Sequence, residues 1–261
     1  MLIKTCGIVV KTQKINSEKK LIWILTKDQG IIKAFCKEGG RRTGGFAATE
    51  LLCFSNFVLF KSKDTFSVNS AEAKEPFLHI RNNLENLALS SYFCQAIVAT
   101  IPQQIEGTAE PLKLTYLLLQ ALNAETNNIL KIKAIFELKL AKLLGFAPDL
   151  NSTSNGLEFY IKTGSLSQTP GLYSVKLNSK VAEAIKFIIN TPIKKSLTLK
   201  LSQTDIKFLT ELAEGYLLDK IEYHLNTLDY FWGIYNQAIK ERAAVLHPLY
   251  PHPLWLGLWH P

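Results

Sequence analysis

The sequence predicts an α+β fold in which a small β-barrel is followed by an all-α domain. Up to about residue 75, β-branched and aromatic residues gather in short runs between polar or glycine-bearing turns, which is typical of strands. From Pro76 onward, apolar residues recur at the three- and four-residue spacing of an amphipathic helix. The chain has 261 residues, of which 47% are apolar, so both parts can contribute to a substantial core.

Five segments of the first 78 residues have the composition of short β-strands. Their connections are polar or contain glycine, as in the segment 14–20 (KINSEKK). The predicted strands are Ile3–Thr12, Leu21–Thr26, Gly30–Lys37, Phe57–Lys61 and Phe66–Ala73. Five is the number of strands in an OB-fold barrel, so we assign residues 1–78 to an N-terminal OB-fold domain.

Residues 79–242 are predicted to form the all-α domain. The strongest helical pattern covers 128–144, where one wide face is apolar, and Gly145 with Pro148 marks its end. The polar residues expected on the outer side of this helix are Lys131, Glu137, Lys139 and Lys142. The other predicted helices are 84–98, Ala109–Ala124, Ser179–Asn190 and Ser202–Leu225, the last with a capping-box-like start at Ser202 and Asp205.

Two segments depart from the helical pattern. Residues 151–178 are rich in Ser, Asn, Gly and Pro, and they contain two short β-like runs, Leu157–Ile161 and Leu172–Val175, which we expect to pair in a small irregular insertion. Residues 243–261 form an atypical tail that is rich in Pro and Trp and contains no Asp, Glu, Lys or Arg. This tail is either an arm that packs on the body or on a partner, or an adventitious extension.

Positive charge is concentrated in the predicted barrel. Residues 1–80 carry a net charge of +6, out of +8 for the whole chain. A local positive field attracts a polyanion, either nucleic acid or an anionic membrane surface, although a basic composition also serves solubility alone. No membrane span or signal peptide is recognisable, and the four cysteines form no CxxC pair. We therefore expect a cytoplasmic protein that does not associate with membranes.

Sequence motifs of catalysis are missing. The chain contains no P-loop, no GxGxxG after a strand, no GxSxG and no HExxH. Its five histidines are either isolated on predicted helices or separated by prolines in the tail, so they form no ordered set of bases or metal ligands. We predict that the protein is not an enzyme and that it carries no cofactor and no metal ion.

One loop combines glycines with cations. Residues 37–46 (KEGGRRTGGF) lie between the third and fourth predicted strands; glycines let backbone N–H groups approach an anion closely, and guanidinium groups pair well with phosphate. The cations predicted to contact nucleic acid are Lys37, Arg41 and Arg42 of this loop, with Lys11 and Lys33 of neighbouring strands. The aromatic residues predicted to stack on bases are Trp23, Phe35 and Phe46. The alternative is a basic surface hairpin without a ligand, with these aromatics in the core.

Five short motifs follow one another along the chain. They are GIVVKT at 7–12, KEGGRR at 37–42, AEA at 71–73, FELKLAKLLGFAPDL at 136–150 and YHL at 223–225. In this order and spacing they resemble the RecO family of bacterial DNA repair proteins, over roughly residues 1–240. The resemblance implies a recombination mediator of the bacterial nucleoid that binds single- and double-stranded DNA and anneals complementary strands. It also implies that the protein acts with RecR to help RecA replace single-strand-binding protein on DNA, without hydrolysing a nucleotide.

The resemblance further implies that the helical domain binds the acidic C-terminal tail of single-strand-binding protein. The cations nearest to the Phe-Glu-Leu element are Lys131, Lys133, Lys139 and Lys142, and we predict that they edge this site. The alternative is a solvated lysine face on an amphipathic helix. Many family members carry a four-cysteine zinc site after the Pro-Asp-Leu element, but the segment 151–156 (NSTSNG) has no cysteine, which again predicts a metal-free protein.

Two other classes of function stay open at this point. An RNA-binding OB-fold adaptor protein would share the basic barrel but leaves the FELKLAKLLGFAPDL segment unexplained. A protein-interaction scaffold would carry its positive charge only incidentally.

Overall fold

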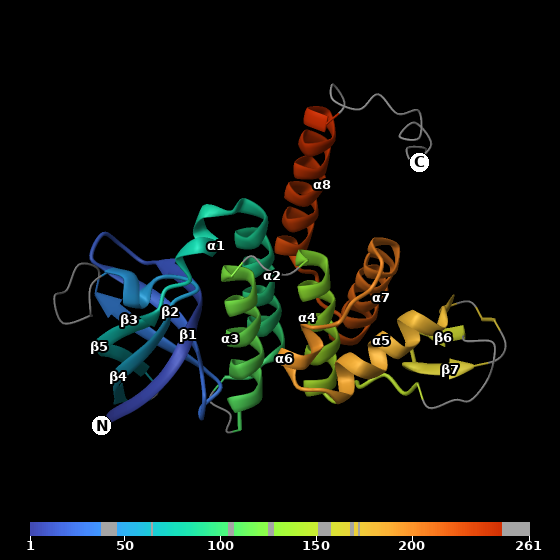
Figure 1. Cartoon of the computed structure of the whole chain (residues 1–261). Coiled ribbons are helices and arrows are strands. Elements are labelled where there is room, and N and C mark those ends of the chain that lie inside the picture. The colour runs from blue at the N-terminus through green and yellow to red at the C-terminus, as the bar shows by residue number, and fades with distance from the viewer. Residues whose placement is uncertain are drawn as a thin grey trace.

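The computed structural model describes residues 1–37, 46–63, 65–103, 107–124, 128–150, 158–167, 170–171 and 173–246. A β-barrel lies at one end, a bundle of helices in the middle and a small sheet at the other end (Figure 1). This arrangement confirms the predicted α+β class. None of the helices in the described ranges combines the length and the apolar character that crossing a membrane requires.

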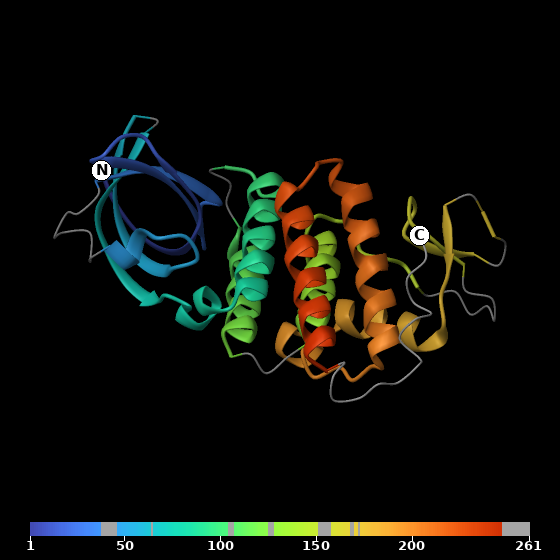
Figure 2. The same cartoon turned by 90° about the horizontal axis from the view of Figure 1, so that it is seen from above.

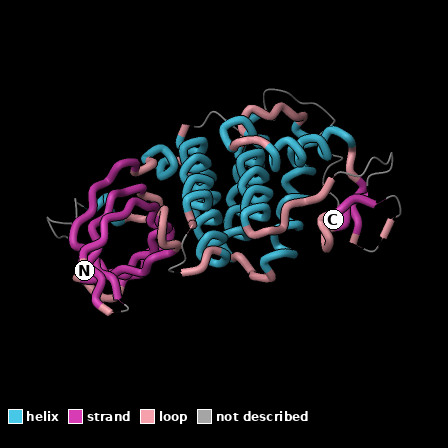
Figure 3. Tube along the Cα trace, turned by 90° about the horizontal axis from the view of Figure 1, so that it is seen from below, coloured by secondary structure: helices cyan, strands magenta, loops and turns pink. Residues whose placement is uncertain are grey.

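Five strands close the N-terminal barrel, as the sequence predicts. The strands are β1 (Leu2–Lys14), β2 (Lys19–Thr26), β3 (Ile31–Lys37), β4 (Phe54–Ser62) and β5 (Thr65–Glu75). They follow the order β1-β2-β3-β5-β4, and β4 pairs with β1 to complete the ring (Figure 3). Only β3 and β5 run parallel among these pairs, with Ala34 opposite Phe66 and Phe35 opposite Ser67.

The alternation of the strands separates an inner from an outer face of the barrel, because successive side chains of a strand point to opposite sides. The residues that fill the interior are Val9, Ile22, Ile24, Ile32, Ala34, Ala48, Phe57, Leu59, Phe66 and Ala71. On the outer face, Ile8, Val10 and Leu25 join a second core, which is shared with the helices. Gly7 of β1 must be a glycine where β1 packs against β2, because a Cβ atom there would lie 2.4 Å from the Leu25 carbonyl oxygen.

Eight α-helices of the described residues follow the barrel. They are α1 (Leu78–Asn82), α2 (Leu84–Thr100), α3 (Ala109–Asn123), α4 (Ile129–Leu143), α5 (Ser179–Asn190), α6 (Ile193–Ser196), α7 (Gln203–Ile221) and α8 (Asn226–Leu246). Helices α2 and α3 pack against β1, and Figure 2 shows α8 alongside α2. The Thr108 hydroxyl donates to the Thr26 carbonyl and accepts from the Gly30 N–H, which fixes the start of α3 to the barrel.

The predicted ends of two helices are confirmed by their caps. Gly145 has a φ of 90° after α4, and its N–H donates to the Lys142 carbonyl while the next N–H reaches Ala141. This is the left-handed closing turn that glycine permits at low cost. At the start of α7, the Ser202 hydroxyl accepts from the Asp205 N–H and donates to the Asp205 carboxylate.

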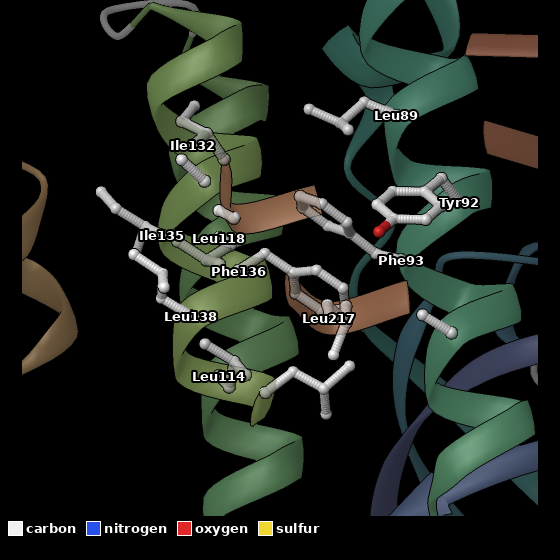
Figure 4. Close-up of a cluster of buried hydrophobic side chains, with 14 of the residues drawn as sticks. Leu89, Tyr92, Phe93, Leu114, Leu118, Ile132, Ile135, Phe136, Leu138 and Leu217 are labelled. Carbon is white, nitrogen blue, oxygen red and sulfur yellow. The ribbon is translucent and has the colours of Figure 1, made fainter. Parts of the chain in front are cut away.

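The inner face of α4 is wider than the sequence pattern predicts. Phe136 stacks on Phe93 of α2 with ring centroids 3.9 Å apart, and Figure 4 shows Tyr92 beside them. The prediction that Glu137 lies on the outer side of α4 is wrong, because this side chain is fully buried. The reason is that α4 is covered by α2 and α3 on one side and by α5 and α7 on the other.

The structure adds elements that the sequence pattern did not predict. The insertion contains three short strands, β6 (Glu158–Tyr160), β7 (Ser165–Ser167) and β8 (Ser174–Lys176), and the predicted pairing is present between β6 and β8. The predicted helix Ser202–Leu225 is too long: α7 ends at Ile221 and a separate helix, α8, follows. Helix α8 extends to Leu246, so the first residues of the predicted tail are helical.

Candidate nucleic-acid interface

The outer face of β1, β2 and β3 carries two of the predicted cations side by side. Trp23 of β2 lies opposite Lys11 of β1 and opposite Lys33 of β3. The Lys11 ammonium lies 4.8 Å from the centre of the indole ring, and that of Lys33 lies 5.7 Å from it. Both lysines are exposed, so their charges face solvent on either side of one aromatic ring.

The Trp23 ring lies beneath the two ammonium groups and is shielded from solvent. Only 7% of the residue is exposed, and it belongs to the core shared with the helices. A cation over an indole face is stabilised by the ring quadrupole, which helps to hold the long lysine side chains in place. The hypothesis that Trp23 stacks on bases therefore has no support in this structure, whereas Phe35 on β3 is 44% exposed.

Lys37 extends the same face toward the glycine-rich loop. It is the last residue of β3, it is exposed, and it lies opposite Lys19 of β2. The loop follows directly, and its Arg41 and Arg42 lie outside the described residues, as does the side chain of Phe46. The structure thus brings Lys11, Lys33 and Lys37 to one face.

Lys20, a further lysine of the barrel, does not contribute its charge to this surface. Lys20 points to the inner face of β2 and is almost fully buried, with its ammonium 2.5 Å from the Glu50 carboxylate. Its neighbours Lys19 and Lys37 are one register position away on the outer side. The alternation of the strand therefore decides which lysines can meet a polyanion.

Comparison with known proteins identifies the family. The sequence profile described as "Recombination protein O N terminal" matches residues 1–77, and that described as "Recombination protein O C terminal" matches residues 81–229. The chain belongs to the RecO family. It is a DNA repair and recombination protein, of a family of recombination mediators without catalytic activity.

Several proteins named "DNA repair protein RecO" are similar to the chain over almost their whole length. That of Acetivibrio thermocellus is 29% identical over 243 residues, which cover 87% of this chain and 95% of the relative. That of Alkaliphilus metalliredigens is 28% identical, over 86% of this chain and 97% of the relative. That of Caldicellulosiruptor saccharolyticus is 27% identical, over 88% of this chain and 97% of the relative.

Three of the four lysines predicted to edge a partner site in this RecO-family chain extend from α4 to backbone carbonyls. Lys131 donates to Leu197 O at 2.8 Å, beside α6. Lys139 donates to Thr191 O at 2.5 Å, and Lys142 donates to Ile189 O at 2.9 Å, both at the end of α5. Burial lowers the pKa of Lys139 to about 8, to which the charge of Lys142 adds. These ammonium groups compensate the partial negative charge of helix C-termini.

The fourth lysine, Lys133, lies in the interior. Its ammonium is fully buried and donates to Glu137 Oε1 at 2.5 Å and to Glu214 Oε2 of α7 at 2.6 Å. The Tyr92 hydroxyl donates to the same Glu137 oxygen at 2.8 Å, and the Trp232 indole N–H of α8 donates to Glu214 Oε2 at 2.7 Å. This buried cluster joins α2, α4, α7 and α8, and the structure places Lys133 apart from the three other lysines.

Burial shifts the pKa of Glu137 in this cluster. Desolvation raises the pKa of Glu137 to about 7, although the nearby Lys133 acts in the opposite direction. The second Glu137 oxygen has no hydrogen-bond partner among the described residues. Sequence reasoning missed the cluster; the one signal for it is the spacing of Lys133 and Glu137, four residues apart on one helix face.

The described residues contain no group of three or more His, Cys, Asp or Glu side chains that could hold a metal ion. Cys36, Cys53 and Cys94 are buried, and burial raises the pKa of Cys94 to about 12. Such thiols behave as small apolar side chains. The predicted absence of zinc stays a prediction, to be checked by elemental analysis of the untagged protein.

Proposed function

We propose that the barrel binds the DNA backbone through Lys11, Lys33 and Lys37, continued by Arg41 and Arg42. The observation that carries this proposal is the placement of the three lysines on the outer face of β1, β2 and β3. The face of strands 2 and 3 is where OB-folds commonly bind oligonucleotides. Lysines that pair with phosphate can bind single and double strands, because both have a phosphate backbone, and such contacts carry no sequence information.

In the same proposal, the protein anneals complementary strands and, together with RecR, helps RecA replace single-strand-binding protein on DNA at the bacterial nucleoid. Membership in the RecO family supports this role. Lys131, Lys139 and Lys142 would edge the site for the acidic tail of single-strand-binding protein. Their ammonium groups each retain N–H donors beyond the carbonyl contacts, since an ammonium group has three.

The salt dependence of DNA binding tests the backbone contacts. Each phosphate contact contributes about −0.7 to the slope of log affinity against log salt on a single strand. Replacing Arg41 and Arg42 together by alanine should therefore flatten the slope by roughly 0.7–1.4. Lys186→Ala, on an exposed lysine of α5, is the matched control and should leave the slope unchanged. A folded double variant with wild-type affinity and slope would show that these arginines do not contact DNA.

A parallel titration separates DNA from RNA as the ligand. Single-stranded DNA and RNA of equal length and sequence are compared at one salt concentration, with and without single-strand-binding protein. The proposal predicts DNA binding together with annealing of complementary strands. A clear preference for RNA without annealing would favour the OB-fold RNA adaptor instead.

A further inference from the structure

The barrel exposes two aromatic side chains that its core does not use. Phe35 of β3 is 44% exposed and Phe60 of β4 is 46% exposed. By contrast, Phe57 and Phe66 of the same barrel are almost fully buried in its interior. Exposing a phenylalanine on a short β-barrel leaves apolar surface in water, so two such residues on one surface indicate a ligand.

The strand register places these two rings on the same outer surface. Phe35 lies opposite Ser67 of β5, and Ser67 lies opposite Phe60 of β4. The two phenylalanines thus flank a small residue on the strand between them. At the usual strand spacing, their backbones are about 10 Å apart. The surface lies on β3, β5 and β4, whereas the helices α2 and α3 pack on β1 and β2 (Figure 1).

Cations border the same surface. Lys33, Phe35 and Lys37 alternate along the outer side of β3, and all three are exposed. Residues two apart on a strand are separated by about 7 Å, so a cation lies within one side-chain length of the ring on either side. A ligand for this surface must therefore combine negative charges with flat apolar groups.

We propose that Phe35 and Phe60 are stacking platforms for unpaired bases, and that they make the barrel prefer single-stranded DNA over duplex. This inference rests on the proposed DNA contact through Lys33 and Lys37 and adds base contacts to it. Aromatic side chains stack on the face of any base, so the contact is independent of sequence. In a duplex the base faces are covered by their neighbours, so only the lysine contacts remain available.

Charge favours a nucleic acid over a protein partner for this surface. Residues 1–80 carry a net charge of +6. A protein partner would have to present acidic groups around an apolar centre, whereas single-stranded DNA offers phosphates and base faces along one chain. Both ligands remain distinguishable by experiment, because only DNA has bases that can be removed without changing its charge.

The test compares an intact single-stranded oligonucleotide, the same oligonucleotide with abasic residues throughout, and a duplex of equal length. Binding of each is measured by fluorescence anisotropy for the full-length protein and for Phe35→Ala, Phe60→Ala and the double variant. Phe35→Leu keeps apolar bulk without an aromatic face, and Phe35→Tyr keeps the ring. Tyr230→Ala removes an exposed aromatic of α8 and is the matched control.

We expect the double variant to bind the intact strand about five-fold more weakly or worse, and to bind the abasic strand and the duplex as the wild type does. Phe35→Leu should behave as Phe35→Ala does, and Phe35→Tyr and Tyr230→Ala as the wild type does. Thermal unfolding of each variant shows whether it is folded, and Phe35→Leu guards against loss of packing in the alanine variant.

The outcomes separate this inference from the proposed function. Lys33→Ala should weaken binding of the intact and the abasic strand equally. If it does so while the phenylalanine variants leave the ratio of the two affinities unchanged, the stacking inference is overturned and the backbone contact stands. If the wild type binds no DNA in a salt-dependent manner, the proposed function itself fails. Loss of RecR binding or of self-association in the phenylalanine variants, with DNA binding intact, would overturn the stacking inference in favour of a protein contact.

Discussion

Lys33 of the barrel and Lys133 of the helical domain are the same residue type in two opposite settings. The Lys33 ammonium lies at the surface, 5.7 Å from the centre of the Trp23 ring, and forms no ion pair with a carboxylate in the described part of the chain. The Lys133 ammonium lies in the core between two carboxylates. A lysine is available to a polyanion only where its charge is not already compensated inside the protein.

The barrel and the helical region differ in the same way as these two lysines. On the barrel, Lys11, Lys33 and Lys37 direct their charge outward. On α4, Lys131, Lys139 and Lys142 direct part of theirs to backbone carbonyls. The difference in positive charge available to a ligand between the barrel and the helical region is therefore larger than the count of basic residues alone indicates.

The largest effect is expected from Lys133→Ala. The substitution leaves the Glu137 and Glu214 carboxylates without their cation in a region of low polarity. Removing one partner of a buried ion pair typically costs about 3–5 kcal/mol in the free energy of unfolding. Chemical denaturation measures this loss of stability. The control, Lys113→Ala, breaks an exposed ion pair with Glu110 and should lower the free energy of unfolding by no more than about 1 kcal/mol. Equal stability of the two variants would show that the buried cluster does not support the fold.

The pH dependence of stability should reflect Glu137. Its pKa is raised from 4.5 to about 7 in the folded protein, so its contribution to stability is complete below pH 4.5 and is lost as the pH rises through 7. The slope contributed by this one group is at most about 1.4 kcal/mol per pH unit. Glu137→Gln removes the titrating group and should flatten the profile between these values. If the free energies of unfolding of the variant and the wild type differ by the same amount at every pH from 4.5 to 7, the pKa of Glu137 is not raised.

The smallest effect on stability is expected from Lys33→Ala. Substitution of an exposed surface residue usually changes the free energy of unfolding by less than about 0.5 kcal/mol. The same variant should flatten the salt slope of single-strand binding by about 0.7. Lys207→Ala, on the exposed side of α7, is the control for the salt slope. A Lys33→Ala protein that is clearly destabilised but keeps its salt slope would assign Lys33 to structure instead of binding.

The sequence by itself determined most of the barrel and several helix boundaries. The five strands were predictable because alternation and turn residues are local signals. The start of α7 at Ser202 and the end of α4 at Gly145 were predictable because caps are set by residues within one turn of the helix. The separation of basic residues between the two halves of the chain is likewise a property of composition.

The break between α7 and α8 could not be read from the sequence. Glu222 closes α7 in the left-handed conformation, with a φ of 47°, where a glycine would be the usual signal. The reason lies in tertiary packing: the Gln95 side chain of α2 accepts hydrogen bonds from the Thr227 N–H and hydroxyl at the start of α8, and Leu225 and Leu228 are buried. These contacts stabilise a turn that local preferences alone would disfavour.

Some features of the candidate site are likewise predictable from the sequence, and others are decided only by the tertiary structure. That Lys33 and Lys37 lie on one face of β3 follows from strand alternation. Lys11 reaches this face only because of the β-bulge between Val9 and Lys11, since strict alternation would point it into the barrel. That Trp23 lies beneath Lys11 and Lys33 depends on the register between β1, β2 and β3. Lys133 and Glu137 have the spacing of an ordinary solvent-exposed pair on a helix. Only the tertiary structure brings Glu214, 81 residues along the chain from Lys133, and Trp232 of α8 to this lysine, because burial depends on which helices cover α4.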